Sequence, residues 1–126
     1  MKIKFTCSSF LPPNNFEWKN IQTISKDLKS DPELFRIGGL KAFTDGSLGS
    51  STALFIAPYT DDPDNYGVPN DIMFPEGNLL RLAVEADKQG FNLSIHAIGD
   101  MANRQLLDIY AHIEKEHGKK DRRWRI

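Results

Sequence analysis

Hydrophobic and polar positions follow two different periods along the chain, and the two periods alternate. Strict alternation or short apolar runs predict four strands, over residues 1–8, 35–44, 91–97 and 122–126. Apolar residues at helical spacing predict three helices, over residues 16–29, 78–89 and 102–116. Strands that alternate with helices in this way indicate an α/β fold with a parallel sheet and right-handed crossovers.

Two architectures fit this order of elements: a small doubly wound sheet, or part of a (β/α)8 barrel. A whole barrel needs about 250 residues, whereas this chain has 126 residues. The chain also ends inside its fourth predicted strand, which favours a section of a barrel over a closed sheet. We therefore expect residues 1–126 to form one fragment, a partial TIM (β/α)8 barrel.

Two predicted strands each carry one chemically capable residue toward the C-terminal end, where barrel enzymes place their active sites. Lys41 lies inside an apolar strand, and His96 lies just before the turn at Gly99 and Asp100. Each also has a simpler interpretation. The Lys41 head could extend to water, and His96 could be a hydrogen-bonded core residue.

The chemistry open to Lys41 depends on burial, because buried lysines shift their pKa and can become neutral. A neutral lysine can react with CO2 to form a carbamate, an anionic oxygen ligand that can bridge two divalent metals. The same position would also suit a lysine that forms a Schiff base. His96 offers an imidazole that can bind a metal or transfer a proton.

Asp45 and Asp100 are candidate catalytic residues, because each opens a loop at the end of a predicted strand. Their carboxylates could bond a substrate amine or orient a ligand imidazole. Asp100 could equally cap the third predicted helix. His112 and His117 are five residues apart on that helix, do not share a face, and are expected at the surface.

Composition excludes several classes of partner. Lys and Arg number 16 against 17 Asp and Glu, so no basic surface for nucleic acid is expected. No apolar stretch approaches the roughly 20 residues of a membrane helix. The first residues are too polar for a signal peptide, so we expect a cytoplasmic protein unless the fragment has lost such a segment. Cys7 is the only cysteine, and no phosphate-binding glycine motif is present, so neither a disulfide framework nor a nucleotide cofactor is expected.

Two long motifs identify a family resemblance. The runs LKAFTDGSLGSSTALFIAPYTDDP and IHAIGDMANRQLLDIY, followed by DRRWRI at the end, resemble the amidohydrolase family 3, the YtcJ-like metal-dependent hydrolases. The resemblance covers nearly the whole chain. It implies a (β/α)8 barrel of the amidohydrolase superfamily, with this chain spanning strand 3 to the start of strand 6.

The resemblance also implies residue roles. Lys41 matches a strand-4 lysine that is a carboxylated metal bridge in related enzymes, His96 matches a strand-5 metal ligand, and Asp45 matches the aspartate of the family's DGS motif. The remaining ligands of the family, on strands 1, 6 and 8, have no counterpart here. The parent protein is thus expected to hydrolyse non-peptide C–N bonds of a small amide-type substrate with a divalent metal, for which zinc suits the ligands. The fragment alone is expected to be inactive.

Alternatives from other classes remain open at this point. A barrel section exposes two unpaired strand edges, which favours a homo-oligomer formed through those edges. A rival interpretation is a non-catalytic half-barrel assembly or binding module. A third is an aldolase that uses Lys41 as a Schiff-base residue.

Overall fold

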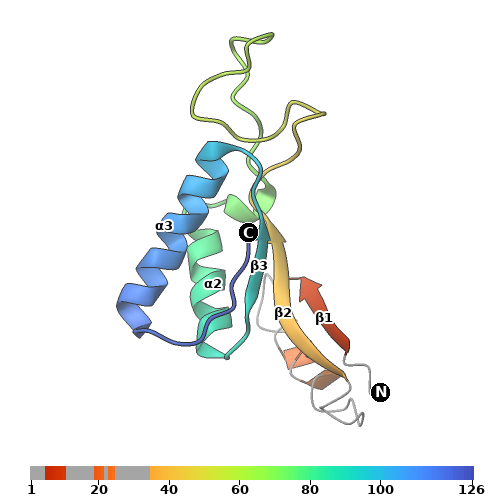
Figure 1. Ribbon diagram of the computed structural model, residues 1–126, viewed down its shortest axis with the longest axis vertical. Helices are drawn as coiled ribbons and strands as arrows, with labels where there is room; N and C mark the ends of the chain where they lie inside the picture. The colour runs from red at the N-terminus through yellow and green to blue at the C-terminus, as the bar shows by residue number, and fades with distance from the viewer. Residues whose placement is uncertain (1–4, 11–18, 22, 25–34) are drawn as a thin grey trace.

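A computed structural model describes residues 5–10, 19–21, 23–24 and 35–126, and Figure 1 shows their arrangement. The elements follow one another as β1 (Phe5–Phe10), β2 (Phe35–Phe43), the short 3-10 helix η1 (Asp71–Met73), α2 (Asn78–Lys88), β3 (Leu93–His96) and α3 (Asp100–His117). Residues 19–21 and 23–24 are helical as predicted. The rest of the helix predicted over residues 16–29 lies outside the described residues, as does the beginning of the first predicted strand.

The sheet is parallel, and its strands lie side by side in the order in which they occur in the sequence, β1-β2-β3. Beyond β3, Arg125 forms a single parallel bridge with Ser94. The Ile95 N–H donates to the Arg125 carbonyl at 3.0 Å, and the Arg125 N–H donates to the Leu93 carbonyl at 2.9 Å. This bridge lies within the stretch predicted to begin a fourth strand.

Helices α2 and α3 lie on the same side of β2 and β3 (Figure 1). The buried core is formed by Leu40 and Ala42 of β2, Leu93 and Ile95 of β3, Leu79, Leu82, Ala83 and Ala86 of α2, and Leu106 and Ile113 of α3. Every second side chain of a strand points to the opposite face. Lys41, Phe43, Ser94 and His96 therefore share the face that points away from the two helices.

A glycine lies at the C-terminal end of each of these two helices. Gly90 has a φ of +78° just after α2, and Gly118 has a φ of +73° at the end of α3. Glycine reaches these left-handed conformations without a Cβ penalty. Helix α3 begins two residues earlier than predicted, with Gly99 as its N-cap residue. None of the described helices is long and apolar enough to cross a membrane.

The long segment between β2 and η1 projects beyond the C-terminal ends of β2 and β3 (Figure 1). Backbone hydrogen bonds organise it. The Thr52 carbonyl accepts from the N–H groups of Gly46 and Val68, both at 3.1 Å, and the Asn70 N–H donates to the Thr44 carbonyl at 2.8 Å. A folded segment of this length at the C-terminal edge of the sheet can support a functional site.

A buried carboxylate joins α2 to the chain after α3. Asp87 Oδ2 lies 2.6 Å from His117 Nδ1 and accepts from Lys120 Nζ at 3.2 Å, while its Oδ1 accepts from Arg122 Nε at 2.6 Å. These hydrogen bonds, first of all that from Arg122, hold the pKa of Asp87 far below its usual value. The expectation of a surface residue is met by His112, but His117 is half-buried because it pairs with Asp87.

Candidate functional site

Lys41 and His96 are diagonal neighbours on the face of the sheet that points away from α2 and α3, called the open face below. Lys41 is paired in register with Ser94, and Phe43 with His96. Lys41 Nζ lies 4.7 Å from the centre of the Phe43 ring, and that ring lies 5.3 Å from the imidazole of His96. The structure therefore brings the two predicted metal ligands to one face near the C-terminal ends of two adjacent strands, with the Phe43 ring in contact with both side chains.

The His96 ring is held by the loop that follows β2. Its Nε2 lies 2.8 Å from the carbonyl oxygen of Gly46 and 3.6 Å from Asp45 Oδ1. A carbonyl oxygen can only accept a hydrogen bond, so Nε2 carries the proton in this contact. In the neutral ring Nδ1 then keeps the lone pair. Nδ1 is the nitrogen that remains available to a ligand.

Asp45 is buried, and both of its oxygens accept backbone hydrogen bonds. Oδ2 accepts from the N–H groups of Leu54 at 2.9 Å and Gly99 at 2.8 Å, and Oδ1 accepts from Ile98 at 3.1 Å. The side chain has no exposed surface. Asp45 thus connects the loop after β2 with the turn after β3, and its predicted catalytic role stays a prediction.

Asp100 makes a second connection between the same two segments. Its Oδ1 accepts from the Ile56 N–H at 2.8 Å. Asp100 is the first residue of α3, and the N-cap residue before it is Gly99, which has no side chain to cap the helix. The predicted alternative of a capping residue therefore does not describe Asp100, although an acidic residue in the first turn suits the helix dipole.

Sequence reasoning missed Thr44 and Leu54 at this site. The Thr44 hydroxyl donates to the His96 carbonyl at 2.6 Å, and the Thr44 N–H donates to the same oxygen at 2.9 Å. The Leu54 carbonyl lies so close to Gly99 that a Cβ on Gly99 would approach it to 1.8 Å. The sequence held one local signal for the first contact, a threonine at the end of an apolar strand. The proximity of Leu54 and Gly99 is a tertiary contact, which no local pattern reveals.

The donor atoms fit part of a metal site. An imidazole nitrogen and a lysine carbamate would be nitrogen and oxygen ligands of a kind that divalent metals accept. Within the part of the chain that the structure describes, no group of three or more His, Cys, Asp or Glu side chains is arranged to hold a metal ion. Lys41 and His96 alone would supply two donors, fewer than the three or more protein ligands that zinc sites in enzymes use.

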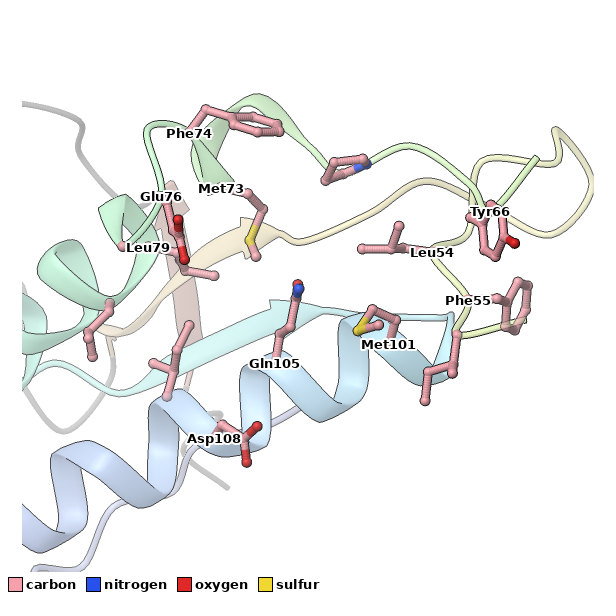
Figure 2. A pocket seen from close by; sticks show the side chains of 15 residues that line it. Leu54, Phe55, Tyr66, Met73, Phe74, Glu76, Leu79, Met101, Gln105 and Asp108 are labelled. Carbon is pink, nitrogen blue, oxygen red and sulfur yellow. The ribbon is translucent and has the colours of Figure 1, made fainter. Parts of the chain in front are cut away.

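An apolar cavity of about 970 Å³ lies between the long loop and the helices. Figure 2 shows Leu54, Phe55 and Tyr66 of the loop at one end, and Met101, Gln105 and Asp108 along α3. The Oε1 atom of Gln105 is buried there and has no hydrogen-bond partner among the described residues. Neither Lys41 nor His96 lines this cavity.

Comparisons with known proteins show to which family the chain belongs. The model of the Amidohydrolase family matches residues 13–126. The chain is 49% identical over 94 residues to the protein LONG AFTER FAR-RED 3 of Arabidopsis thaliana, which covers 75% of this chain. It is 38% identical over 85 residues to YtcJ of Bacillus subtilis strain 168, a protein named as an amidohydrolase, which covers 68% of this chain.

Two solved structures are similar as well. A metal-dependent hydrolase of Pyrococcus furiosus has a TM-score of 0.66 and 30% identity over 90% of this chain. One of Pyrococcus horikoshii OT3 has a TM-score of 0.60 and 30% identity over 94% of this chain. The chain spans 16% of the length of each curated relative and 22% of each solved structure. Because the family model matches nearly the whole chain, the chain belongs to the amidohydrolase family.

Proposed function

We propose that this chain is one section of the (β/α)8 barrel of a longer metal-dependent hydrolase that cleaves C–N bonds other than peptide bonds in small amide-type molecules. The observation that carries the proposal is the shared face of Lys41 and His96 at the C-terminal ends of β2 and β3. Active sites of barrel enzymes are built at that end of the strands. Family membership supports a hydrolase with a divalent metal.

The order of the strands supports a barrel section over a doubly wound sheet. A doubly wound sheet reverses its strand order at a switch point. Here β1, β2, β3 and the bridge at Arg125 follow one another without reversal. The face that carries Lys41 and His96 points away from α2 and α3. In a closed barrel that face would be the interior.

Within the proposed site, Lys41 and His96 would hold the metal, and zinc suits a set of imidazole and carboxylate-type ligands. When bound, such an ion polarises the substrate carbonyl and makes water a stronger nucleophile at neutral pH. His96 would present Nδ1, because Gly46 occupies its Nε2 proton. Asp100 would anchor the long loop at Ile56 beside the site. The remaining ligands would come from other parts of the longer protein, so we propose that the chain alone is inactive.

The test is an assay of the longer protein and of this chain alone against a panel of small N-acyl substrates. Lys41→Ala and His96→Ala should each lower hydrolysis by at least about 100-fold, because loss of a residue that only supports a metal ligand already costs about 10- to 100-fold. Lys115→Ala and His112→Ala are matched controls, because both residues are exposed on α3. Full activity in either site variant, or equal losses in the controls, would contradict the proposal.

A second candidate function is a non-catalytic half-barrel assembly or binding module, and the apolar cavity is the observation that favours it. Its volume of about 970 Å³ lies at the upper end of the range of ligand pockets.

We also propose that the chain alone forms homo-oligomers through its exposed strand edges. Light scattering of the purified chain tests this, and a monomer at all concentrations would contradict it.

A further inference from the structure

We infer that Asp45 is a positioning residue, which fixes the tautomer and orientation of His96 and does not itself touch the substrate. The role of His96 as a metal ligand rests on the proposed function. The tautomer of its ring is independent of that function and can be measured without any metal. The inference follows from three observations: the burial of Asp45, its hydrogen bonds, and the contact between His96 and Gly46.

The Asp45 carboxylate is inaccessible to a substrate. Its side chain has no exposed surface, and its oxygens accept hydrogen bonds from the N–H groups of Leu54, Ile98 and Gly99. A carboxylate offers about four lone-pair sites, so three of them are used. His96 Nε2 lies 3.6 Å from Oδ1.

These bonds also determine where the Gly46 carbonyl points. Gly46 follows Asp45 directly, and its N–H donates to the Thr52 carbonyl at 3.1 Å. The backbone of Gly46 is therefore fixed on one side by the buried carboxylate and on the other by the loop. Its carbonyl oxygen lies 2.8 Å from His96 Nε2 and requires a proton on that nitrogen.

The charge of Asp45 acts in the same direction. A carboxylate 3.6 Å from Nε2 favours the tautomer that places the N–H dipole toward it. Asp45 also holds the turn after His96 through Ile98 and Gly99. Position and tautomer of the ring thus depend on one carboxylate, and Nδ1 is left as the nitrogen with a lone pair.

The experiment is NMR of the full chain, without metal, labelled with 15N in the histidine rings. At about pH 9, well above the usual imidazole pKa, the ring nitrogens report the tautomer directly. We expect wild-type His96 to hold its proton on Nε2. In Asp45→Asn the ratio of the Nε2–H tautomer to the Nδ1–H tautomer should fall by about tenfold. This is the effect that the loss of about one hydrogen bond has on an equilibrium.

Asp100→Asn is the matched control, because the Asp100 carboxylate also accepts a backbone N–H, that of Ile56, whereas the Nε2 atom of His96 lies near Gly46 and Asp45. The inference is overturned if wild-type His96 carries its proton on Nδ1, or if Asp45→Asn and Asp100→Asn change the tautomer equally. Asp45→Glu keeps the charge and should retain the Nε2–H form, which keeps the test decisive if Asp45→Asn does not fold. An inactive longer protein would leave this result unaffected, and a failed tautomer test would leave the hydrolase proposal standing.

Discussion

At the scale of single residues, the site is held together by close backbone approach. Gly99 has an ordinary φ of −66°, so no left-handed conformation requires glycine at this position. The reason for glycine is space, because a Cβ would lie 1.8 Å from the Leu54 carbonyl oxygen. That approach lets the Asp45 carboxylate reach the N–H groups of both Leu54 and Gly99.

Gly99→Ala should therefore destabilise the fold by about 3 kcal/mol, the cost of overpacking against atoms that cannot move aside. Gly49→Ala is the matched control, because a Cβ there meets nothing within 4 Å. It should change stability by less than about 1 kcal/mol. Urea unfolding followed by circular dichroism measures both variants, and equal stability of the two would contradict the packing argument.

The sequence indicated candidate residues at the ends of the strands but did not reveal the contacts that these residues make. Lys41 and His96 could be placed toward the C-terminal ends of two strands because strand patterns are local, whereas the face that they share depends on the register between the strands. Asp45 and Asp100 looked alike, since each follows a strand. Their difference depends on partners 9 to 54 positions away, which no local pattern reveals.

At the scale of elements, Asp87 holds the segment after α3 against α2. Its carboxylate is buried and bonded to His117, Lys120 and Arg122. Nearby, the Tyr110 hydroxyl donates to the Arg125 carbonyl at 3.2 Å, and burial raises the pKa of Tyr110, so this donor stays protonated. These contacts place Arg125 beside β3, where its backbone continues the sheet.

Asp87→Asn should lower the free energy of unfolding by about 3 kcal/mol, because it leaves the largely buried Arg122 guanidinium without its counter-charge. Asp121→Asn is the control: its carboxylate is exposed and pairs only with exposed Arg123, a contact worth less than about 1 kcal/mol. Thermal unfolding at neutral pH compares the two variants. Similar losses in both would show that Asp87 is not a central contact.

Wild type and Asp87→Asn also test how the contribution of Asp87 to stability depends on pH. The pKa of Asp87 in the folded chain lies well below its ordinary value of 3.8. A depressed carboxyl pKa contributes stability that is present above the unfolded pKa and is lost as pH falls below it. The stability difference between wild type and Asp87→Asn should thus be full at neutral pH and shrink below about pH 4. A constant difference down to about pH 2 would contradict the depressed pKa.

The helices show where sequence patterns suffice. The buried stripe of α2, formed by Leu79, Leu82, Ala83 and Ala86, follows directly from helical spacing. Asp87 looked like one more charged residue of the same helix. Its burial could not be predicted, because its partners lie 30 to 35 positions later in the chain.

At the scale of the whole molecule, the chain has one covered and one open face. Helices α2 and α3 cover one side of β2 and β3 (Figure 1), and strand alternation places Lys41 and His96 on the other. The chain also spans only 16% of the length of its curated relatives. Both facts agree with a section whose site is completed by other parts of a longer protein. The sequence predicted the parallel sheet, the alternating strands and helices, and the family, whereas the barrel section and its shared site stay proposals.

The most direct test of this account is the metal content of the longer protein, measured by elemental analysis of wild type, His96→Ala and the control His112→Ala. The account predicts at least one divalent metal ion per chain in wild type and in His112→Ala, and a loss of metal in His96→Ala. The same metal content in all three proteins would contradict the claim that this section supplies part of the metal site.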